Sequence, residues 1–288
     1  MRFLDLFSGI GGFRLGLEMA GHECVGHVEI DKYANQSYRA IHKPKERKFF
    51  HEDITTITDE SIRELRNRGI DIIAGGFPCQ TFSIAGERRG FEDIRGTLFF
   101  DISRIAKEIK PKYLFLENVK GLLNQDNGDT FEVILRTLDE IGYNAEWQVL
   151  NSKNFGVPQN RERVFIIGHL RGEGTRQIFP QPMVCNETKI KVTHLLDLAG
   201  KEQINRVYSA NGISPALTTM QGGRQEPKIL WGKCIRKLTP KECWRLQGFP
   251  DWAFERAKVA GVSDSQLYKQ AGNSVTVNVV YEIAKRLK

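Results

Sequence analysis

The chain has 288 residues, of which 40% are hydrophobic and 27% charged, values typical of a globular protein with one large domain or a domain and a smaller partner. This composition excludes intrinsic disorder and collagen. The chain contains no run of about 18 apolar residues, so no membrane span is predicted. The N-terminus lacks the pattern of a secretory signal, so we expect a cytoplasmic protein. The five cysteines include no Cys-x-x-Cys pair, which argues against a disulfide framework and against a zinc site or other metal centre.

Charge is distributed unevenly along the chain. Residues 1–150 contain 20 Lys and Arg against 24 Asp and Glu, whereas residues 151–288 contain 22 against 11. The two halves therefore carry net charges of −4 and +11. A basic C-terminal half indicates contact with a polyanion, usually nucleic acid, although a merely solvated surface can have the same composition.

Short apolar runs alternate with amphipathic stretches from the N-terminus to about Leu170. Strands are predicted at 2–6, 23–30, 70–76 and 112–118, and helices at 12–21, 31–42, 60–69, 97–110 and 130–142. Two more apolar runs, 143–151 and 163–169, are predicted to close the domain as strands. This alternation predicts an α/β fold with a mostly parallel sheet covered on both faces.

Helical periodicity disappears between residues 170 and 233, where short β-like pieces such as 206–209 and 216–219 alternate with turn residues. We expect a small, irregular, β-rich second domain there. Helical signals return at 239–249, where Thr239 can cap a helix together with Glu242, and at 274–287. The terminal helix is predicted to pack back on the first domain.

A glycine-rich turn containing Gly9, Gly11 and Gly12 follows the first strand, the position where α/β sheets bind nucleotides. A dinucleotide fingerprint would need a third glycine at the position of Arg14, so a pyrophosphate site is disfavoured. Glu29, at the end of the second strand, suits an acceptor for ribose hydroxyls. The pattern favours a nucleoside without phosphates, with a plain tight connection as the alternative.

Cys79 and Glu117 follow the third and fourth clear strands of the series. The carboxyl ends of parallel strands lie at one sheet edge, so both residues are expected to converge on one crevice with the Gly9 turn. A polar stretch at 81–96 resembles a lid. The simpler alternatives are a buried, inert cysteine and a glutamate that caps a helix or lies at the surface.

Gln159, Arg161 and Arg163 alternate before an apolar run, which predicts that they share one face of a strand. They could form a solvated edge strand. Alternatively, the two arginines could hold a phosphate or orient a carboxylate such as Glu117.

An ordered set of motifs now identifies a resemblance. The chain resembles the DNA (cytosine-5) methyltransferases of bacterial and phage type over nearly its whole length. The motifs are DLFSGIGGF (5–13), EIDKYA (29–34), GGFPCQTFS (75–83), RGTLFFD (95–101), ENV (117–119), QNRER (159–163), RKLTPKECWRLQGFP (236–250) and GNSV (272–275). In this order they are highly specific.

The resemblance implies a Rossmann-like methyltransferase fold and S-adenosyl-L-methionine as cofactor. It assigns cofactor binding to Phe7, Gly9, Gly11, Glu29, Ile30, Asp53, Pro78, Leu98, Asn273 and Ser274. Ile30 stands where the family often has an aromatic residue. Asn273 and Ser274, expected at the start of the last helix, reach the site if that helix returns to the first domain.

The resemblance also implies the chemistry. Cys79 adds as thiolate to C6 of a cytosine that has been flipped out of the duplex, and Glu117 stabilises N3 while C5 accepts the methyl group. Arg161 and Arg163 are the expected cations of this catalytic group.

The segment 170–233 corresponds to the family's target-recognition region, within a small domain at 170–271. The catalytic domain would comprise 1–169, completed by 272–288. Double-stranded DNA is the expected partner of a monomer without an obligate protein partner or membrane contact, and a cognate restriction endonuclease could act separately. The expected DNA-contacting residues are Ser83, Arg88 and Arg89 in the lid, Gln203 in the vacated base stack, and Arg206, Gln221 and Arg224 at bases or phosphates.

Three other functions remain as alternatives. A tRNA methyltransferase would share Cys79, Glu117 and the cofactor loop, because the carbon chemistry is the same. A non-catalytic DNA-binding relative would not need these three features together. A nicotinamide oxidoreductase is opposed by Arg14 and by the lack of an obvious hydride-site histidine.

Overall fold

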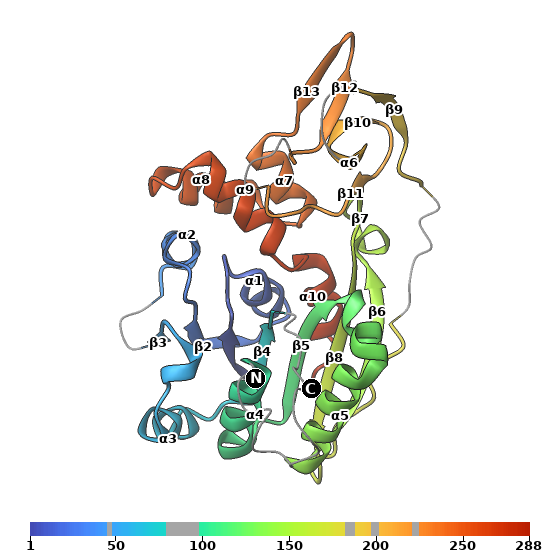
Figure 1. The fold of residues 1–288 in the computed structure, drawn as a ribbon. Helices are drawn as coiled ribbons and strands as arrows, with labels where there is room; N and C mark the ends of the chain where they lie inside the picture. The colour runs from blue at the N-terminus through green and yellow to red at the C-terminus, as the bar shows by residue number, and fades with distance from the viewer. Residues whose placement is uncertain (45–47, 79–97, 182–187, 197–201, 221–224) are drawn as a thin grey trace.

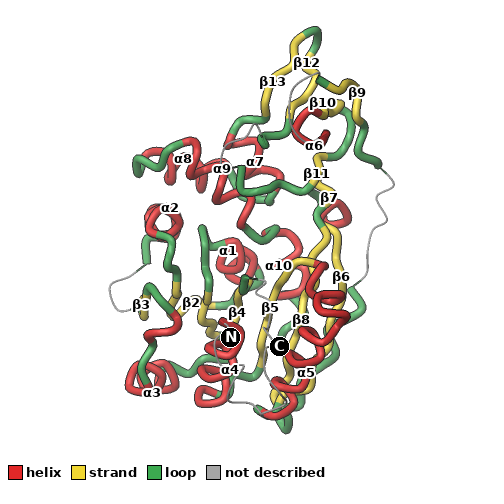
Figure 2. The backbone as a smooth tube through the Cα atoms, in the orientation of Figure 1, coloured by secondary structure: helices red, strands yellow, loops and turns green. Residues whose placement is uncertain are grey.

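The structure is a computed structural model that describes residues 1–44, 48–78, 98–181, 188–196, 202–220 and 225–288, with the side chain of Gln203 left out. Figure 1 shows a large α/β body at the bottom and a small sheet at the top. Figure 2 shows helices α7, α8 and α9 between these two parts. None of the helices in these residues combines the length and apolar character that a membrane-spanning segment needs.

The large body is built on a seven-stranded sheet of order β3-β2-β1-β4-β5-β8-β6. Its strands are β1 (Arg2–Leu6), β2 (Glu23–Val28), β3 (Phe49–His51), β4 (Ile72–Gly76), β5 (Tyr113–Val119), β6 (Tyr143–Asn151) and β8 (Glu162–Leu170). Neighbouring strands from β3 to β5 are parallel, whereas β8 runs antiparallel to both β5 and β6. The order reverses between β1 and β4, which makes their carboxyl ends the expected binding edge.

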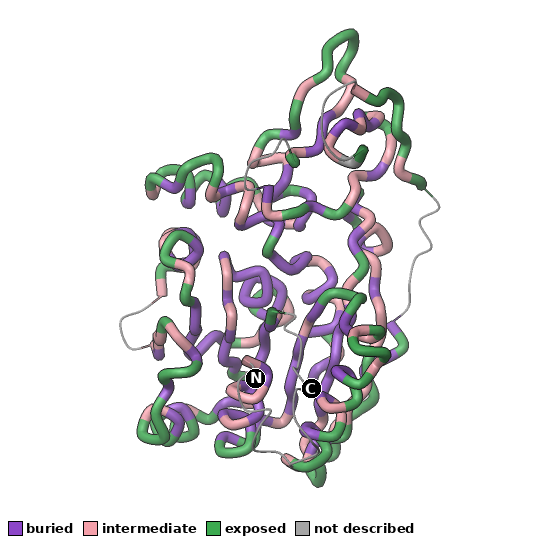
Figure 3. The backbone as a smooth tube through the Cα atoms, in the orientation of Figure 1, coloured by how far each residue is buried: buried purple, intermediate pink, exposed green. Residues whose placement is uncertain are grey.

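Helices cover both faces of this sheet. They are α1 (Gly12–Met19), α2 (Lys32–His42), α3 (Asp59–Asn67), α4 (Leu98–Ile109), α5 (Asp129–Glu140) and α10 (Val277–Ala284), with 3-10 turns η1 (Ile54–Thr56), η2 (Lys120–Gly128) and η3 (Ser152–Phe155). One core packs α3, α4 and α5 against one side of the strands, and a second packs α1 and α10 against the other. Buried backbone accordingly concentrates in the central strands (Figure 3).

The small sheet has the order β13-β12-β10-β9. It comprises β9 (Val192–Leu195), β10 (Arg206–Ser209), β12 (Lys228–Trp231) and β13 (Cys234–Lys237), with the short helix α6 (Glu202–Asn205) before β10. A two-residue pairing of β7 (Gln159–Asn160) with β11 (Ser214–Pro215) links this region to the large sheet. The small sheet therefore continues past residue 233, to Lys237.

The helical group between the two sheets contains α7 (Pro240–Leu246), α8 (Asp251–Val259) and α9 (Asp264–Asn273). Thr239 and Glu242 form the predicted capping box at the start of α7. A third apolar core joins these helices to Ile10, Leu15 and Ile41 of the large body. The helical group is thus packed directly on α1 and α2.

The strands and helices predicted between the N-terminus and Leu170 are confirmed, with small differences at their ends, and so are 206–209 as β10 and 239–249 as α7. Two predictions are wrong. Residues 216–219 form no strand, because only Ser214 and Pro215 pair with a neighbour. The last helix begins at Val277 rather than at 274, since Ser274 has an extended backbone that ends α9. Among the elements that were not predicted from the sequence are β3, α8 and α9.

Candidate active site

A cavity of about 450 Å³ lies at the carboxyl ends of β1, β4 and β5, where the strand order reverses. The loop after β1, the end of β2, the loop after β4 and the end of β5 form its walls, and the end of α9 closes it. Segments near the two ends of the chain therefore meet there. The predicted convergence of the Gly9 turn with the end of β5 is confirmed.

Glu29 forms one end of this cavity. Its side chain is 9% exposed, and its two carboxylate oxygens accept hydrogen bonds from the backbone N–H groups of Gly9 (2.6 Å) and Asp31 (2.7 Å). Burial raises the pKa of Glu29, although the two amide hydrogen bonds oppose the shift. Each oxygen keeps acceptor capacity for a further donor, such as a ribose hydroxyl.

Gly9 lies opposite this carboxylate with a backbone φ of +54° and nothing within 4 Å of the position that a Cβ would take. A side chain there would be strained and would project into the space that the loop leaves open. An acidic acceptor beside an open glycine loop fits a nucleoside, so these residues fit the nucleoside part of S-adenosyl-L-methionine.

Seven of the ten predicted cofactor residues line the cavity: Phe7, Gly9, Glu29, Ile30, Pro78, Asn273 and Ser274. Asn273 and Ser274 do so from the end of α9, not from the start of the last helix as the sequence analysis expected. Ile30 is 70% exposed at the rim.

The other three predicted cofactor residues lie outside the cavity lining. Gly11 has a φ of +85°, and a Cβ on it would overlap the ring of His42 beneath the loop. Asp53 follows β3 and caps η1 through Thr55. Leu98 begins α4 and packs against the core of α3, α4 and α5.

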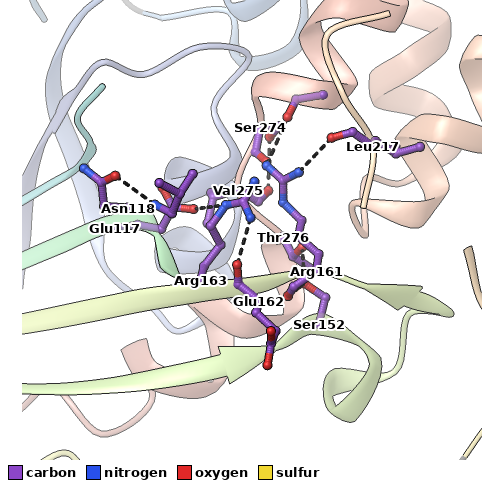
Figure 4. A network of polar contacts seen from close by, with 12 residues as sticks. Glu117, Asn118, Ser152, Arg161, Glu162, Arg163, Leu217, Ser274, Val275 and Thr276 are labelled. Atoms are coloured by element: carbon purple, nitrogen blue, oxygen red, sulfur yellow. Dashed lines mark hydrogen bonds and ion pairs between the residues drawn. The ribbon is translucent and has the colours of Figure 1, made fainter. Parts of the chain in front are cut away.

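Glu117 and Arg163 form the opposite end of the cavity. Nε of Arg163 lies 3.1 Å from Oε1 of Glu117, and their side chains are 19% and 12% exposed. Their strands are antiparallel neighbours, β5 and β8, which places the two side chains side by side (Figure 4). Burial raises the pKa of Glu117, while the positive charges of Arg163 and Arg161 lower it; the net shift is upward.

Arg161 is 3% exposed, and its guanidinium donates hydrogen bonds to the carbonyl oxygens of Leu217 (3.2 Å), Gly272 (3.0 Å) and Ser274 (2.8 Å). Burial lowers its pKa to about 9, and the charge of Arg163 adds to this effect. Figure 4 shows it bridging the segment before β8 and the end of α9. Arg161 therefore joins three segments of backbone and makes no ion pair with Glu117.

Gln159 is fully buried as well. Its Nε2 donates to the carbonyl of Leu246, and its Oε1 accepts from the N–H of Leu217. A solvated edge strand, the simpler alternative for this motif, is therefore wrong.

The model of the C-5 cytosine-specific DNA methylases matches residues 1–221 and 198–288 of the chain. Among curated proteins, the chain is 40% identical to the type II methyltransferase M.HhaI of Haemophilus parahaemolyticus, over 99% of this chain and 93% of that protein. It is 39% identical to the type II methyltransferase M.NlaX of Neisseria lactamica, over 100% and 96%.

The chain belongs to the C-5 cytosine-specific DNA methylase family. It is thus a DNA (cytosine-5) methyltransferase with DNA as its substrate. Among solved structures, S. pombe Dnmt2 methyltransferase is similar, with a TM-score of 0.73 and 22% identity over 99% of this chain and 97% of that one. Entamoeba histolytica methyltransferase EhMeth has a TM-score of 0.72 and 18% identity over 98% and 96%. At these identities the two structures show that the fold is shared.

Several predicted residues of the methyltransferase lie outside the described residues, namely Cys79, Ser83, Arg88, Arg89, Gln221 and Arg224. Gln203 belongs to α6, but its side chain is not described. Arg206 begins β10 and forms an ion pair of 2.8 Å with Glu202, one helical turn earlier.

Asn118 is a site residue of the methyltransferase that the sequence analysis missed. It is 2% exposed, and its Nδ2 donates to the carbonyl oxygen of Phe77 over 2.9 Å. This bond ties the end of β5 to the loop that leads through Pro78 into Cys79. Its place in the ENV motif (117–119) was the signal in the sequence that could have identified it.

Proposed function

We propose that this methyltransferase transfers a methyl group from S-adenosyl-L-methionine to C5 of a flipped cytosine in a short specific sequence of double-stranded DNA. The supporting observation is the cavity that joins the Glu29 corner to the Glu117–Arg163 pair and is bordered by Pro78. One cavity with a nucleoside acceptor at one end and a buried acid at the other suits methyl transfer between two bound molecules.

The residues proposed to hold the cofactor are those at the Glu29 end. Glu29 would accept hydrogen bonds from the ribose hydroxyls, and Gly9 would allow close approach of the backbone. Ile30, Asn273 and Ser274 would complete the walls. When bound, the cofactor supplies an electrophilic methyl group.

The chemistry of the base rests on Cys79 and Glu117. C5 of cytosine is a poor nucleophile, so the Cys79 thiolate adds to C6 and the electrons of the C5–C6 double bond shift into the ring. Glu117, whose pKa is raised by burial, hydrogen-bonds or protonates N3 and so stabilises the charge there. Transfer of the methyl group to C5 would break its bond to the sulfonium sulfur of the cofactor, which would leave as a neutral thioether; a base would then remove the C5 proton, and elimination of the Cys79 thiolate would restore the C5–C6 double bond.

Arg163 orients Glu117 in this scheme, and Arg161 supports the surrounding backbone. Arg163 holds the carboxyl at 3.1 Å, and Arg161 connects the loop at Leu217 to the end of α9. A free thiol has a pKa of about 8.5, and these two cations near the crevice favour its thiolate.

The proposed target base leaves the duplex, because C5 and C6 cannot reach the cavity from inside a base stack, at a cost of a few kcal/mol. Contacts of DNA with the basic C-terminal half offset this cost. Ser83, Arg88 and Arg89 would cover the flipped base, and Gln203 would fill its place. Arg206, Gln221 and Arg224 would contact bases or phosphates.

We also propose the domain division that this function needs. Residues 1–169 and 272–288 form the catalytic domain, and 170–271 the small domain, with target recognition at about 170–233. The packing of α10 on α1 supports the return of the C-terminus to the catalytic domain. The enzyme would act as a monomer, and any cognate restriction endonuclease would act separately.

The function is tested by incubating the protein with S-adenosyl-L-methionine and unmethylated DNA of mixed sequence, followed by bisulfite sequencing. We expect methylation confined to cytosines in one short motif. Cys79→Ser is expected to abolish this methylation while retaining DNA binding, because the hydroxyl is a much weaker nucleophile than a thiolate.

A duplex with 5-fluorocytosine at the target position distinguishes the covalent route. Fluorine cannot leave as a proton does, so the wild type is expected to stay attached to the DNA on a denaturing gel, and Cys79→Ser is not. Full methylation by Cys79→Ser would exclude Cys79 as the nucleophile. An active wild type that gives no shifted band would exclude addition to C6.

A further inference from the structure

An ion pair crosses the rim of the cofactor end of the cavity. Nζ of Lys269, in α9, lies 2.7 Å from Oδ2 of Asp31, the residue before α2. Their side chains are 26% and 27% exposed, and both residues line the cavity. The pair joins two segments that are 238 residues apart in sequence.

Gln270, the next residue of α9, makes a second link to α2. Nε2 of Gln270 donates to the carbonyl oxygen of Tyr33, and its Oε1 accepts from Oγ of Ser37, both over 2.9 Å. Gln270 is 5% exposed and Ser37 is fully buried. Lys269 and Gln270 together therefore clamp the N-terminal half of α2 against α9.

Asp31 transmits this clamp to Glu29. Its Oδ1 accepts hydrogen bonds from the N–H groups of Tyr33 and Ala34, which caps α2, and its own N–H donates to Oε1 of Glu29 over 2.7 Å. Oε2 of Glu29 is held by Gly9. A displacement of Asp31 would remove one of the two bonds that fix the direction of the Glu29 carboxylate.

We propose that Lys269 is a positioning residue for the cofactor: through its ion pair with Asp31 it holds Glu29 in the orientation that accepts the ribose hydroxyls. This inference rests on the proposed function. Beyond Asn273 and Ser274 at the end of α9, it adds the preceding turn of this helix to the parts of the enzyme that determine cofactor affinity. Removing an outer partner of a metal-ligating side chain weakens metal binding by about 10–100-fold, and we expect a loss at the lower end of that range for the residue that supports Glu29.

The test measures binding of S-adenosyl-L-methionine by isothermal titration calorimetry, together with steady-state methylation of DNA. Lys269→Met is expected to weaken binding and raise KM for the cofactor by about tenfold, with kcat within about twofold of wild type, because the chemical groups are untouched. Lys269→Arg, which keeps the charge, is expected to recover most of the affinity. Lys258→Met is the matched control, since it removes an exposed ion pair of 2.5 Å with Asp264 at the start of the same helix.

A double variant shows whether Lys269 acts through Glu29. Glu29→Gln alone is expected to weaken binding, and Lys269→Met with Glu29→Gln is expected to bind no more weakly than Glu29→Gln alone. Additive losses would overturn the positioning role. Circular dichroism verifies that each variant is folded. If Lys269→Met does not fold, Lys269→Gln replaces it, with the same expected loss of cofactor affinity.

The two proposals fail in different ways. A folded wild type that does not bind S-adenosyl-L-methionine contradicts the proposed function. A wild type that binds and methylates, with Lys269→Met indistinguishable from it in cofactor affinity, contradicts the inference alone.

Discussion

Arg161 and Arg163 look equivalent in sequence but differ in their surroundings. Strand alternation puts both on one face, and the structure confirms that they are neighbours of the same cavity. Only Arg163 faces a carboxylate, because its register on β8 brings it beside Glu117. Arg161 lies in the break between β7 and β8 and points toward three carbonyl oxygens instead. Charge and spacing alone could not separate a partner of Glu117 from a support of the backbone.

Glu117→Gln tests the acid at the residue scale. The amide can donate a hydrogen bond but cannot supply a proton to N3, so we expect the single-turnover rate to fall by about 10²–10⁴-fold, the usual contribution of general acid–base catalysis. DNA and cofactor binding should change little. Glu162→Gln is the control, since Glu162 is next to Arg163 but pairs with Lys120 at the surface. A rate equal to that of the control would remove Glu117 from the chemistry.

At the scale of elements, the junction between α9 and the loop around Leu217 determines the shape of the site. Gly272 lies in the last turn of α9, and a Cβ there would overlap the carbonyl oxygen of Thr218. The same junction is held by the hydrogen bonds of Arg161 to Leu217 and Gly272. Asn273 and Ser274 reach the cavity because the helix ends at this contact.

Gly272→Ala is therefore expected to push the loop away from α9. Overpacking against backbone costs about 1–3 kcal/mol, which should appear as a lower free energy of unfolding in urea. Cofactor affinity should also fall, because Asn273 and Ser274, which line the cavity, directly follow Gly272 in the sequence. Gly121→Ala serves as control, because a Cβ there would meet only Val119 at 4.0 Å. Equal free energies of unfolding for the two variants would show that the loop around Leu217 moves aside without loss of stability.

At the scale of the whole molecule, buried polar side chains connect the large body to the helical group. Oε1 of Gln247 accepts from Oγ1 of Thr276, whose hydroxyl also contacts that of Ser152 at 2.8 Å, and Nε2 of Gln247 donates to the carbonyl of Ala271. These three side chains are at most 3% exposed. The network joins η3 of the large body to α7, α9 and α10, so the two parts are tied together by satisfied hydrogen bonds.

The buried His27 and the half-buried His42, near the cofactor loop, make the stability of the whole molecule sensitive to acid. Burial lowers the pKa of His27 to about 4 and that of His42 to about 3. Unfolded histidine titrates near about 6.5, so below that pH the unfolded chain binds protons that the folded chain does not. Their contribution to stability is complete above about pH 6.5 and is lost as the pH falls toward 4.

The free energy of unfolding should fall as the pH decreases from about 6.5 to 4.5. We expect His27→Gln and His42→Gln each to reduce the slope of this fall, by an amount that corresponds to up to one bound proton. Urea unfolding at a series of pH values measures this slope. Each variant is compared with the wild type, because the raised pKa values of Asp5, Glu29 and Glu117 change the pH dependence of stability in the opposite direction. His194→Gln, at an exposed position, provides the control. Slopes identical to wild type in both variants would contradict the assignment.

The sequence by itself determined the order of strands and helices from the N-terminus to Leu170 apart from β3, and the meeting of Glu29 and Glu117 with the glycine loop at one sheet edge. These follow from local periodicity and from the rule that parallel strands end together. Ordered motifs added the family, which the comparisons confirm.

Only the tertiary structure decided what α9 does. Lys269 and Gln270 lie in a helix that the sequence did not predict, and the motif that begins at Gly272 does not indicate what Gly272 contacts. Their partners, Asp31, Tyr33 and Thr218, are far from them in sequence. Contacts at such separations depend on how the chain returns after the small sheet, and no local propensity encodes that path. The same reason places Asn273 and Ser274 at the end of one helix rather than at the start of the next.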